Sequence, residues 1–203
     1  IPVAVEMHSP KAVDVLNNFF FARVSKIITT NPLTKENLSD VFNINKEKFI
    51  VEPNGVDEFA FRVMNKEDAR KELNLPTDAK IALYIGRFYD WKGMDILQKA
   101  AGSLQKENIL VYLVGGTKEE YETATKGQSA PLCFGGSVPH NKIATWCAAA
   151  DAVLILGTRA SEFSYRYTAP MKLFEYLASG RPTICADTPA LRSLVSEQEV
   201  DFY

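Results

Sequence analysis

Apolar runs rich in β-branched residues alternate with amphipathic segments along nearly the whole chain. The runs that predict strands occupy residues 3–7, 26–29, 49–52, 80–85, 109–114, 131–134, 152–156 and 182–185. The helical patterns between them lie near residues 11–22, 33–42, 66–74, 94–106, 117–125, 139–149, 170–179 and 188–196. Because runs such as residues 81–85 are apolar on both faces, helices should cover both sides of the sheet. The chain is therefore predicted to be an α/β protein with a doubly wound, Rossmann-like parallel sheet.

The best boundary in the chain is the segment Pro53-Asn54-Gly55, which stops a strand and fixes a turn. We expect residues 53–57 to be an interdomain linker. Residues 1–52 carry too few elements for a core of the usual size, and are expected to be the carboxyl-terminal part of a first domain. Residues 58–203 are expected to form most of a second domain, truncated at its end. The first residues, Ile1-Pro2-Val3, have a strand pattern and no initiating Met, which indicates a fragment of a longer protein.

Composition excludes several classes of function. Apolar residues make up 46% of the 203 residues and charged residues 24%, an ordinary globular balance, and the formal charge of −2 provides no field that attracts nucleic acid. The three cysteines show no CxxC spacing and there are only two histidines, so no metal site and no cofactor are predicted. Reduced, buried thiols fit a cytoplasmic protein. No run approaches the roughly 18 apolar residues of a membrane span, and no signal peptide is visible.

Two cations lie in the turn between the predicted strand 80–85 and the helix that begins near residue 94. Gly86 ends the strand, Arg87 offers a planar fork for paired phosphate oxygens, and Lys92 adds a mobile point charge. The free N–H groups of the following helix would add donors. This arrangement predicts a diphosphate site that includes Gly86. The alternative, that both cations are ordinary solvated surface residues, remains open on this segment alone.

A second segment, Ala169 to Pro182, places Glu175 on the first turns of a helix that leads into another strand. A carboxylate near a diphosphate site is suited to the hydroxyl pair of a ribose, although a solvent-facing helix carboxylate is the simpler alternative. Gly115 and Gly116 do not form the GxGxxG fingerprint of dinucleotide-binding proteins. A nucleotide sugar is therefore favoured over a nicotinamide cofactor.

Three motifs in order resemble one family. The family is that of retaining GT-B glycosyltransferases, group 1 or family four. Its diphosphate turn is similar to Gly86-Arg87 followed by Trp91-Lys92-Gly93, and its linker is similar to Pro53-Asn54-Gly55-Val56-Asp57. Its nucleotide-binding helix is similar to the run Lys172-Leu173-Phe174-Glu175-Tyr176-Leu177-Ala178-Ser179-Gly180-Arg181-Pro182. The order and spacing agree from about residue 2 to residue 200. The resemblance implies that Arg87 and Lys92 hold the donor phosphates and stabilise the departing diphosphate without a metal.

The same resemblance implies further contacts with the donor. Glu175 would accept hydrogen bonds from the ribose hydroxyls, and the loop at Val138 and Pro139 would contact the nucleobase. His8, after the first strand, would face the donor sugar across the cleft; Ser9 before Pro10 is a candidate helix N-cap, so His8 is not needed for capping. His140 is interpreted as a solvated residue of a helix's first turn.

The chain departs from the family pattern at Tyr167, where the first glutamate of a paired-glutamate motif would lie eight residues before Glu175. In its place, backbone N–H groups at the helix start could hold the distal phosphate or the sugar. The four residues concerned are Pro170, Met171, Lys172 and Leu173. Glu162, further upstream in the same loop, is an alternative carboxylate.

Together these features predict a cytoplasmic, retaining, hexosyltransferase-like enzyme that uses a nucleoside diphosphate sugar and no metal. The expected acceptor is a carbohydrate or a lipid-linked sugar, and a peripheral membrane contact through the missing domain stays open. We expect the isolated fragment to be inactive. The departure at Tyr167 motivates a second hypothesis, a nucleotide-binding module or partner subunit without transferase activity. A GT-B epimerase of nucleotide sugars is a third, which the linker and the Lys-Gly turn disfavour.

Overall fold

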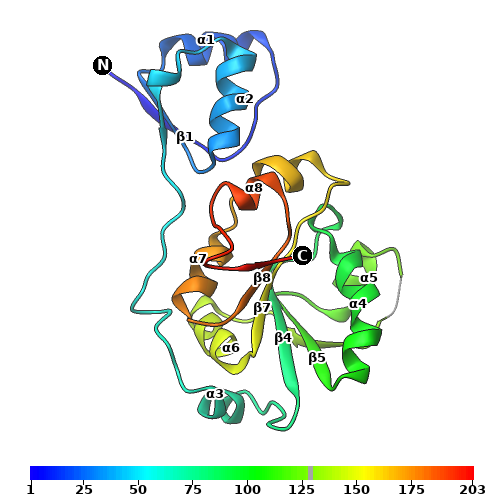
Figure 1. Ribbon diagram of the computed structural model, residues 1–203. Helices are drawn as coiled ribbons and strands as arrows, with labels where there is room; N and C mark the ends of the chain where they lie inside the picture. Colours follow the sequence, from blue (N-terminus) through cyan, green and yellow to red (C-terminus); the bar gives the residue numbers. More distant parts are fainter. Residues whose placement is uncertain (128–129) are drawn as a thin grey trace.

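The computed structural model describes residues 1–127 and 130–203, in which two parallel sheets are joined by an extended segment (Figure 1). The smaller sheet has the strand order β1-β2-β3. Its strands are β1 (Ala4–Met7), β2 (Lys26–Thr29) and β3 (Phe49–Val51), and its helices are α1 (Val15–Arg23) and α2 (Pro32–Phe42). A 3-10 turn, η1 (Lys46–Lys48), precedes β3. Phe21, Ile27 and Leu38 are among the buried residues that form the core of this N-terminal unit.

The larger sheet is parallel throughout and has the order β6-β5-β4-β7-β8-β9. Its strands are β4 (Lys80–Ile85), β5 (Ile109–Val114), β6 (Leu132–Gly136), β7 (Ala152–Ile155), β8 (Thr183–Cys185) and β9 (Asp201–Phe202). This is the order of a Rossmann sheet, and it reverses between β4 and β7. The carboxyl ends of these two strands therefore flank the crevice in which such sheets bind ligands. The predicted doubly wound parallel sheet is confirmed.

Helices cover both faces of the larger sheet, α4 and α5 on one side and α6 and α7 on the other (Figure 1). The helices of this unit are α3 (Lys66–Glu72), α4 (Met94–Lys106), α5 (Lys118–Ala124), α6 (Ile143–Ala149), α7 (Met171–Ala178) and α8 (Pro189–Arg192). Side chains of β4 alternate between two cores. Leu83 packs with the core that contains α6 and α7 residues, whereas Tyr84 packs with the core that contains Met94 and Leu97 of α4. This two-sided burial is the reason for the unbroken apolar run in the sequence.

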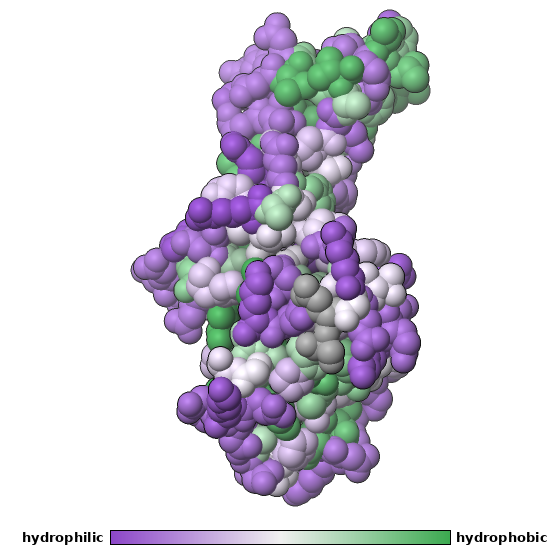
Figure 2. All heavy atoms as spheres, turned by 90° about the vertical axis from the view of Figure 1, so that its right-hand side faces the viewer, coloured by the Kyte–Doolittle hydropathy of each residue, from purple (hydrophilic) through white to green (hydrophobic). Residues whose placement is uncertain are grey.

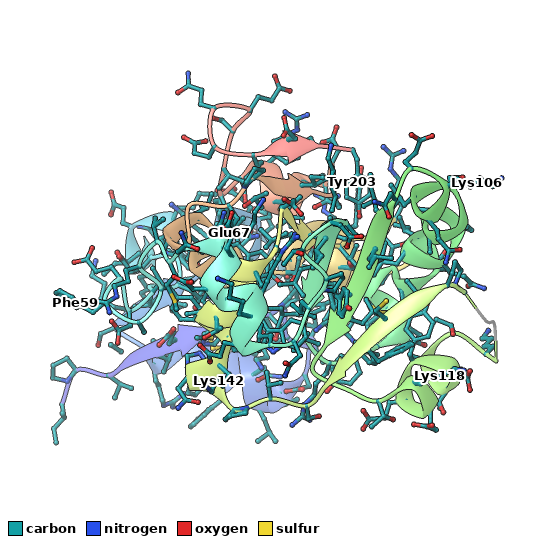
Figure 3. All side chains as sticks on the ribbon, turned by 90° about the horizontal axis from the view of Figure 1, so that it is seen from below. Phe59, Glu67, Lys106, Lys118, Lys142 and Tyr203 are labelled. Atoms are coloured by element: carbon teal, nitrogen blue, oxygen red, sulfur yellow. The ribbon has the colours of Figure 1, made fainter. Side chains whose placement is uncertain are left out.

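The connection between the units follows β3 and runs along the outside of the molecule to α3 (Figure 1). The Asp57 carboxylate stabilises a turn in it by accepting hydrogen bonds from the backbone N–H groups of Phe59 (3.0 Å) and Ala60 (3.2 Å). Phe59 projects away from the ribbon in Figure 3 and is 85% exposed. The segment from 53 to 57 thus has no regular secondary structure and lies between the last strand of one unit and the first helix of the next.

Several sequence predictions about elements are wrong in detail. The helix predicted over residues 11–22 begins only at Val15, because Asp14 and not Ser9 is its N-cap and accepts from the Asn17 N–H at 2.7 Å. The helix predicted over 188–196 ends at Arg192. The short edge strand β9 is absent from the sequence prediction, since two residues carry no periodic signal, and the second unit therefore has six strands instead of five.

Apolar side chains gather on the N-terminal unit at the top of the space-filling view, whereas the larger unit shows a mixed, mostly polar surface (Figure 2). The exposed apolar residues of the N-terminal unit include Val13, Val15 and Leu16 before and at the start of α1. Within residues 1–127 and 130–203, no helix combines the length and apolar character of a bilayer span. The three thiols Cys133, Cys147 and Cys185 are free, and burial raises the pKa of Cys147 to about 12.

Candidate functional site: a cation cluster at the sheet crevice

The turn after β4 forms the centre of the candidate site. Gly86 has a φ of +151°, and a side chain there would meet the Tyr84 hydroxyl at 3.0 Å. Gly115, directly after β5, has a φ of +114°, and a Cβ there would lie 2.8 Å from the Gly86 carbonyl oxygen. The glycines therefore allow two strand ends to approach each other. After this turn the chain passes through the 3-10 segment η2 (Asp90–Lys92) and enters α4.

Three cations converge on this turn, from two elements. Desolvation lowers the pKa of Lys92 below its usual value of 10.5, and the positive charges of Lys172 and Arg87 lower it further. The Lys92 ammonium lies 3.4 Å from the Arg87 carbonyl oxygen and faces the rings of Tyr89 and Trp91 at 5.1 and 5.4 Å. Lys172 comes from the first turn of α7, about eighty positions along the chain. Neighbouring positive charges that lower the pKa of a lysine also favour the binding of an anion.

Helix α7 is fixed against the end of β4. The Tyr176 hydroxyl accepts a hydrogen bond from the Ile85 N–H at 2.9 Å and is buried, which raises its pKa. Leu173 on the same helix is fully buried in the core. With these two anchors on its inner face, α7 presents Lys172 to the crevice. The side chain of Leu173 is buried, and its backbone N–H donates to the Pro170 carbonyl oxygen at 3.1 Å, so both of these groups are occupied within the protein.

Glu175 is buried, with 4% of its surface exposed, and is not the solvent-facing carboxylate of the simpler alternative. Its Oε2 accepts a hydrogen bond from the Lys172 ammonium at 3.1 Å, and its Oε1 lies 3.1 Å from Nε2 of His140. The His140 ring also packs edge-to-face on Phe61, with centroids 5.7 Å apart. A buried carboxylate held from two sides is well ordered, and its remaining lone pairs can accept from hydroxyl groups.

His140 is the site residue that sequence reasoning misses. The sequence interpretation makes it a solvated first-turn residue, and most of its side chain is indeed exposed, but its ring nitrogen contacts Glu175. It begins the 3-10 turn η3 (His140–Lys142), directly after Val138 and Pro139. Val138 is half-buried against the larger core and Pro139 is exposed. The predicted nucleobase loop therefore lies beside the predicted ribose residue.

The loop between β7 and α7 contains one turn of π-helix, η4 (Phe163–Tyr167), where the hydrophobic pattern predicts neither a helix nor a strand. Tyr167 is buried and its hydroxyl accepts a hydrogen bond from the amide of Asn37 in the N-terminal unit at 3.2 Å. Pro170 is the N-cap of α7, and Met171 is exposed at the helix start. Glu162, the alternative carboxylate, is exposed at the start of η4.

The imidazole of His8 contacts Glu6 at 3.2 Å. Met7 and Thr29 are register partners on the parallel strands β1 and β2, so His8 leaves the sheet at the same edge as Thr30 and Asn31. The Asn31 amide in turn contacts the Thr168 carbonyl oxygen of the larger unit at 3.3 Å. His8 is therefore on the edge of the small sheet that faces the loop before α7.

Two hollows adjoin the cluster. The larger, about 710 Å³, opens between the turn after β4 and α5; Arg87, Tyr89, Glu120, Lys126 and Ser137 are among its lining residues. The smaller, about 60 Å³, lies between the ends of β4 and β7 and is lined in part by Lys92, Lys172 and Pro170. Arg87 thus borders the larger hollow, whereas Lys92 and Lys172 border the smaller one.

The comparisons with known proteins agree with this geometry. The family model described as "Glycosyl transferases group 1" matches residues 65–202, and the chain belongs to this family. D-inositol 3-phosphate glycosyltransferase 1 of Catenulispora acidiphila is 32% identical over 157 residues, covering 70% of this chain and 36% of that protein. The corresponding enzyme of Streptosporangium roseum is 25% identical over 187 residues, covering 85% and 41%. The chain therefore spans well under half the length of these relatives.

Solved structures show the same fold. Anabaena HepE in complex with UDP-glucose has a TM-score of 0.73 and 20% identity, covering all of this chain and 58% of that one. Sucrose-phosphate synthase from Thermosynechococcus elongatus also has a TM-score of 0.73, with 24% identity and coverage of 92% and 47%. The likeness at this level concerns the fold, which is that of GT-B glycosyltransferases.

Proposed function

We propose that this chain contains the donor-binding part of a retaining glycosyltransferase that transfers a sugar from a nucleoside diphosphate sugar. The observation that carries the proposal is the convergence of Arg87, Lys92 and Lys172 at the point where the strand order reverses. Desolvation lowers the pKa of Lys92 most, and the charges of Lys172 and Arg87 lower it further; a bound anion would offset the repulsion between these cations. A diphosphate is suited to this place because it offers several oxygens to three separate donors.

The contacts along α7 suggest the direction of the donor. The ribose would lie at Glu175, whose two oxygens are held by His140 and Lys172. The diphosphate would lie next to it, at Lys172 and Lys92. The sugar would then lie towards the start of α7 and the loop before it, opposite the sheet edge that carries His8.

In the proposed reaction, the bond between the anomeric carbon and the β-phosphate oxygen breaks, and its electron pair remains on the diphosphate. The cations stabilise the charge that develops there. The acceptor hydroxyl oxygen bonds to the anomeric carbon from the same face, which retains configuration, and its proton passes to the departing phosphate oxygen. We propose that the three cations supply this charge stabilisation without a divalent metal and that the acceptor is a carbohydrate or a lipid-linked sugar.

Isothermal titration of the 203-residue chain with UDP, GDP, ADP and their glucose derivatives tests the proposal. Arg87→Ala and Lys92→Ala should each weaken binding of the preferred diphosphate about 10- to 100-fold, as expected for the loss of one charged hydrogen bond. Lys80→Ala is the matched control, because Lys80 is an exposed cation at the opposite end of the same strand. Binding that survives in excess EDTA supports a metal-independent site. Failure of all these nucleotides to bind would overturn the proposal.

A nucleotide-binding module without transferase activity is the second candidate, favoured by the replacement of a carboxylate by Tyr167. The test is turnover of the preferred donor by the chain extended to the length of its relatives. Release of free sugar or transfer to an acceptor supports the enzyme, whereas tight binding without either supports the module.

A further inference from the structure

Three asparagines of the N-terminal unit and the linker donate hydrogen bonds to three consecutive residues before α7. We call these asparagines the asparagine latch. Asn37 Nδ2 donates to the Tyr167 hydroxyl at 3.2 Å, Asn31 Nδ2 to the Thr168 carbonyl oxygen at 3.3 Å, and Asn54 Nδ2 to the Ala169 carbonyl oxygen at 2.7 Å. The donors are spread over twenty-four positions of the chain, yet their acceptors are adjacent. Such a match requires the two units to be held in one particular arrangement.

The side chain of Asn31 is fixed before it reaches across. It is fully buried and is the N-cap of α2, where its Oδ1 accepts from the N–H groups of Leu33 at 2.7 Å and Thr34 at 3.3 Å. Because the oxygen is used within its own unit, the amide nitrogen points outward, towards Thr168. A fully buried asparagine that lost this partner would leave a donor unsatisfied, which is costly in a low-dielectric environment.

The acceptor segment, residues 167–169, has no regular structure beyond its first residue. Tyr167 ends the π-helix η4, Thr168 is its extended C-cap, and Pro170 is the N-cap of α7. Proline disfavours helical geometry at the residue before it, so Ala169 cannot continue either helix. The carbonyl groups of Thr168 and Ala169 accept from the asparagine latch, whereas helix residues would bond to their own turns. The start of α7 is thus positioned by the N-terminal unit.

We propose that the asparagine latch sets the position of the start of α7 relative to the sugar end of the bound donor, so that the N-terminal unit controls the sugar-dependent part of donor affinity. This inference rests on the proposed function, in which ribose, diphosphate and sugar follow α7 from Glu175 back towards Tyr167. Tyr167 acts as a positioning residue: its hydroxyl bonds to Asn37 and fixes the loop, in the place where the family pattern has a carboxylate.

Two variants test the latch, one for each partner of the bond between Asn37 and Tyr167. Tyr167→Phe removes only the hydroxyl, and Asn37→Ala removes its donor. Tyr165→Phe is the matched control, since Tyr165 lies in the same π-helix and its ring packs 5.7 Å from the Arg159 guanidinium. Each variant of the 203-residue chain would be titrated with UMP, UDP and UDP-glucose, after circular dichroism has verified that it is folded.

The inference predicts that both latch variants weaken UDP-glucose binding about 5- to 20-fold, as expected for one buried hydrogen bond, while UMP binding stays within about twofold. The double variant should bind UDP-glucose no more weakly than either single variant, because the two substitutions remove the same hydrogen bond. The control should bind all three ligands as the wild type does. Equal weakening of all three ligands, or no weakening at all, would overturn the inference.

Hydrogen exchange separates failure of the latch from failure of the proposed function. The amides of residues 168, 169 and 171–173 should exchange faster in Asn37→Ala and in Asn54→Ala than in the wild type, with or without ligand. A wild-type chain that binds neither these uridine nucleotides nor the corresponding guanosine and adenosine nucleotides would overturn the proposed function and the ligand-dependent part of the inference. Unchanged exchange in both variants would show that the asparagines do not hold the segment.

Discussion

The Nε2 atom of His140 lies 3.1 Å from Oε1 of Glu175, across 35 positions of the chain. With Lys172 on the other oxygen, this contact fixes a buried carboxylate at the mouth of the crevice. The arrangement gives Glu175 a defined orientation before any ligand arrives, which lowers the entropic cost of binding.

Glu175→Ala should weaken UDP binding about 100-fold or more, because two hydroxyl hydrogen bonds to a charged acceptor are lost. The same variant should bind UDP that lacks the 2′- and 3′-hydroxyls as the wild type does, since that ligand makes no such bonds. Titration of both ligands measures the difference. Glu162→Ala is the control; a larger loss there than at Glu175 would show that the ribose contact belongs to the other carboxylate.

Nucleotide binding should take up protons at alkaline pH through Lys92. Its pKa is lowered in the free chain by desolvation and by Lys172 and Arg87, and a bound diphosphate would raise it. Affinity for UDP should therefore fall as the pH rises through the lowered pKa. Titrations in buffers of different ionisation enthalpy measure the proton uptake. Proton uptake of the same size in Lys92→Met would refute its assignment to Lys92.

Lys92 should also make the stability of the free chain depend on pH, but stability should rise with pH where the affinity for UDP falls. Between the lowered folded pKa and the usual value of 10.5, the unfolded chain binds more protons than the folded chain, so the free energy of unfolding should rise with pH there. Urea unfolding across this window should show a shallower rise for Lys92→Met than for the wild type.

The pair formed by Arg70 and Asp151 should be a main determinant of stability in the larger unit. The Arg70 guanidinium is 3% exposed and donates to Asp151 at 2.6 Å, and the Asp151 carboxylate also accepts from the Ile81 N–H at 2.8 Å. Asp151→Ala would leave a buried guanidinium without its counterion and should cost about 3 kcal/mol of unfolding free energy in urea melts. Lys66→Ala, which removes a partly exposed partner of the same carboxylate, should cost less than about 1 kcal/mol.

Acid should act on the same pair. Burial alone would raise the pKa of Asp151, but Lys66, the Ile81 N–H and Arg70 together bring it below the usual 3.8. The stability that this carboxylate contributes should therefore be complete above about pH 4 and be lost as the pH falls through the folded pKa. A wild-type acid transition that persists unchanged in Asp151→Asn would contradict this assignment.

Two glycines should respond to alanine in opposite directions. Gly102 lies within α4, and a Cβ added there would meet nothing within 4 Å, so Gly102→Ala should stabilise the chain by about 0.5–1 kcal/mol. Gly86 has a φ of +151° and a crowded neighbour, so Gly86→Ala should destabilise it by about 1–3 kcal/mol. Thermal melts of both variants provide the comparison; a neutral Gly86→Ala would show that the turn tolerates a side chain.

The hydrophobic pattern predicts the class of sheet and most of the elements, because an inner strand that is buried on both faces has a continuous apolar sequence. For β4, the pattern predicts the observed ends, Lys80 and Ile85. The ends of helices and very short strands are predicted less well from the pattern. Helix α1 begins after its predicted start because Asp14, and not Ser9, accepts a hydrogen bond from an N–H group of its first turn. The two-residue strand β9 has no pattern to recognise.

The sequence by itself determined the doubly wound sheet, the glycosyltransferase motifs and the placement of Lys172 and Glu175 on one helix, since a separation of three residues on a helix is a local property. Only the tertiary structure decided that Lys172 approaches Lys92, that His140 contacts Glu175, and that Tyr167 bonds to Asn37. Those pairs are joined by strand order and by the arrangement of two units. No sequence spacing encodes a contact between segments that meet only after the sheet has assembled.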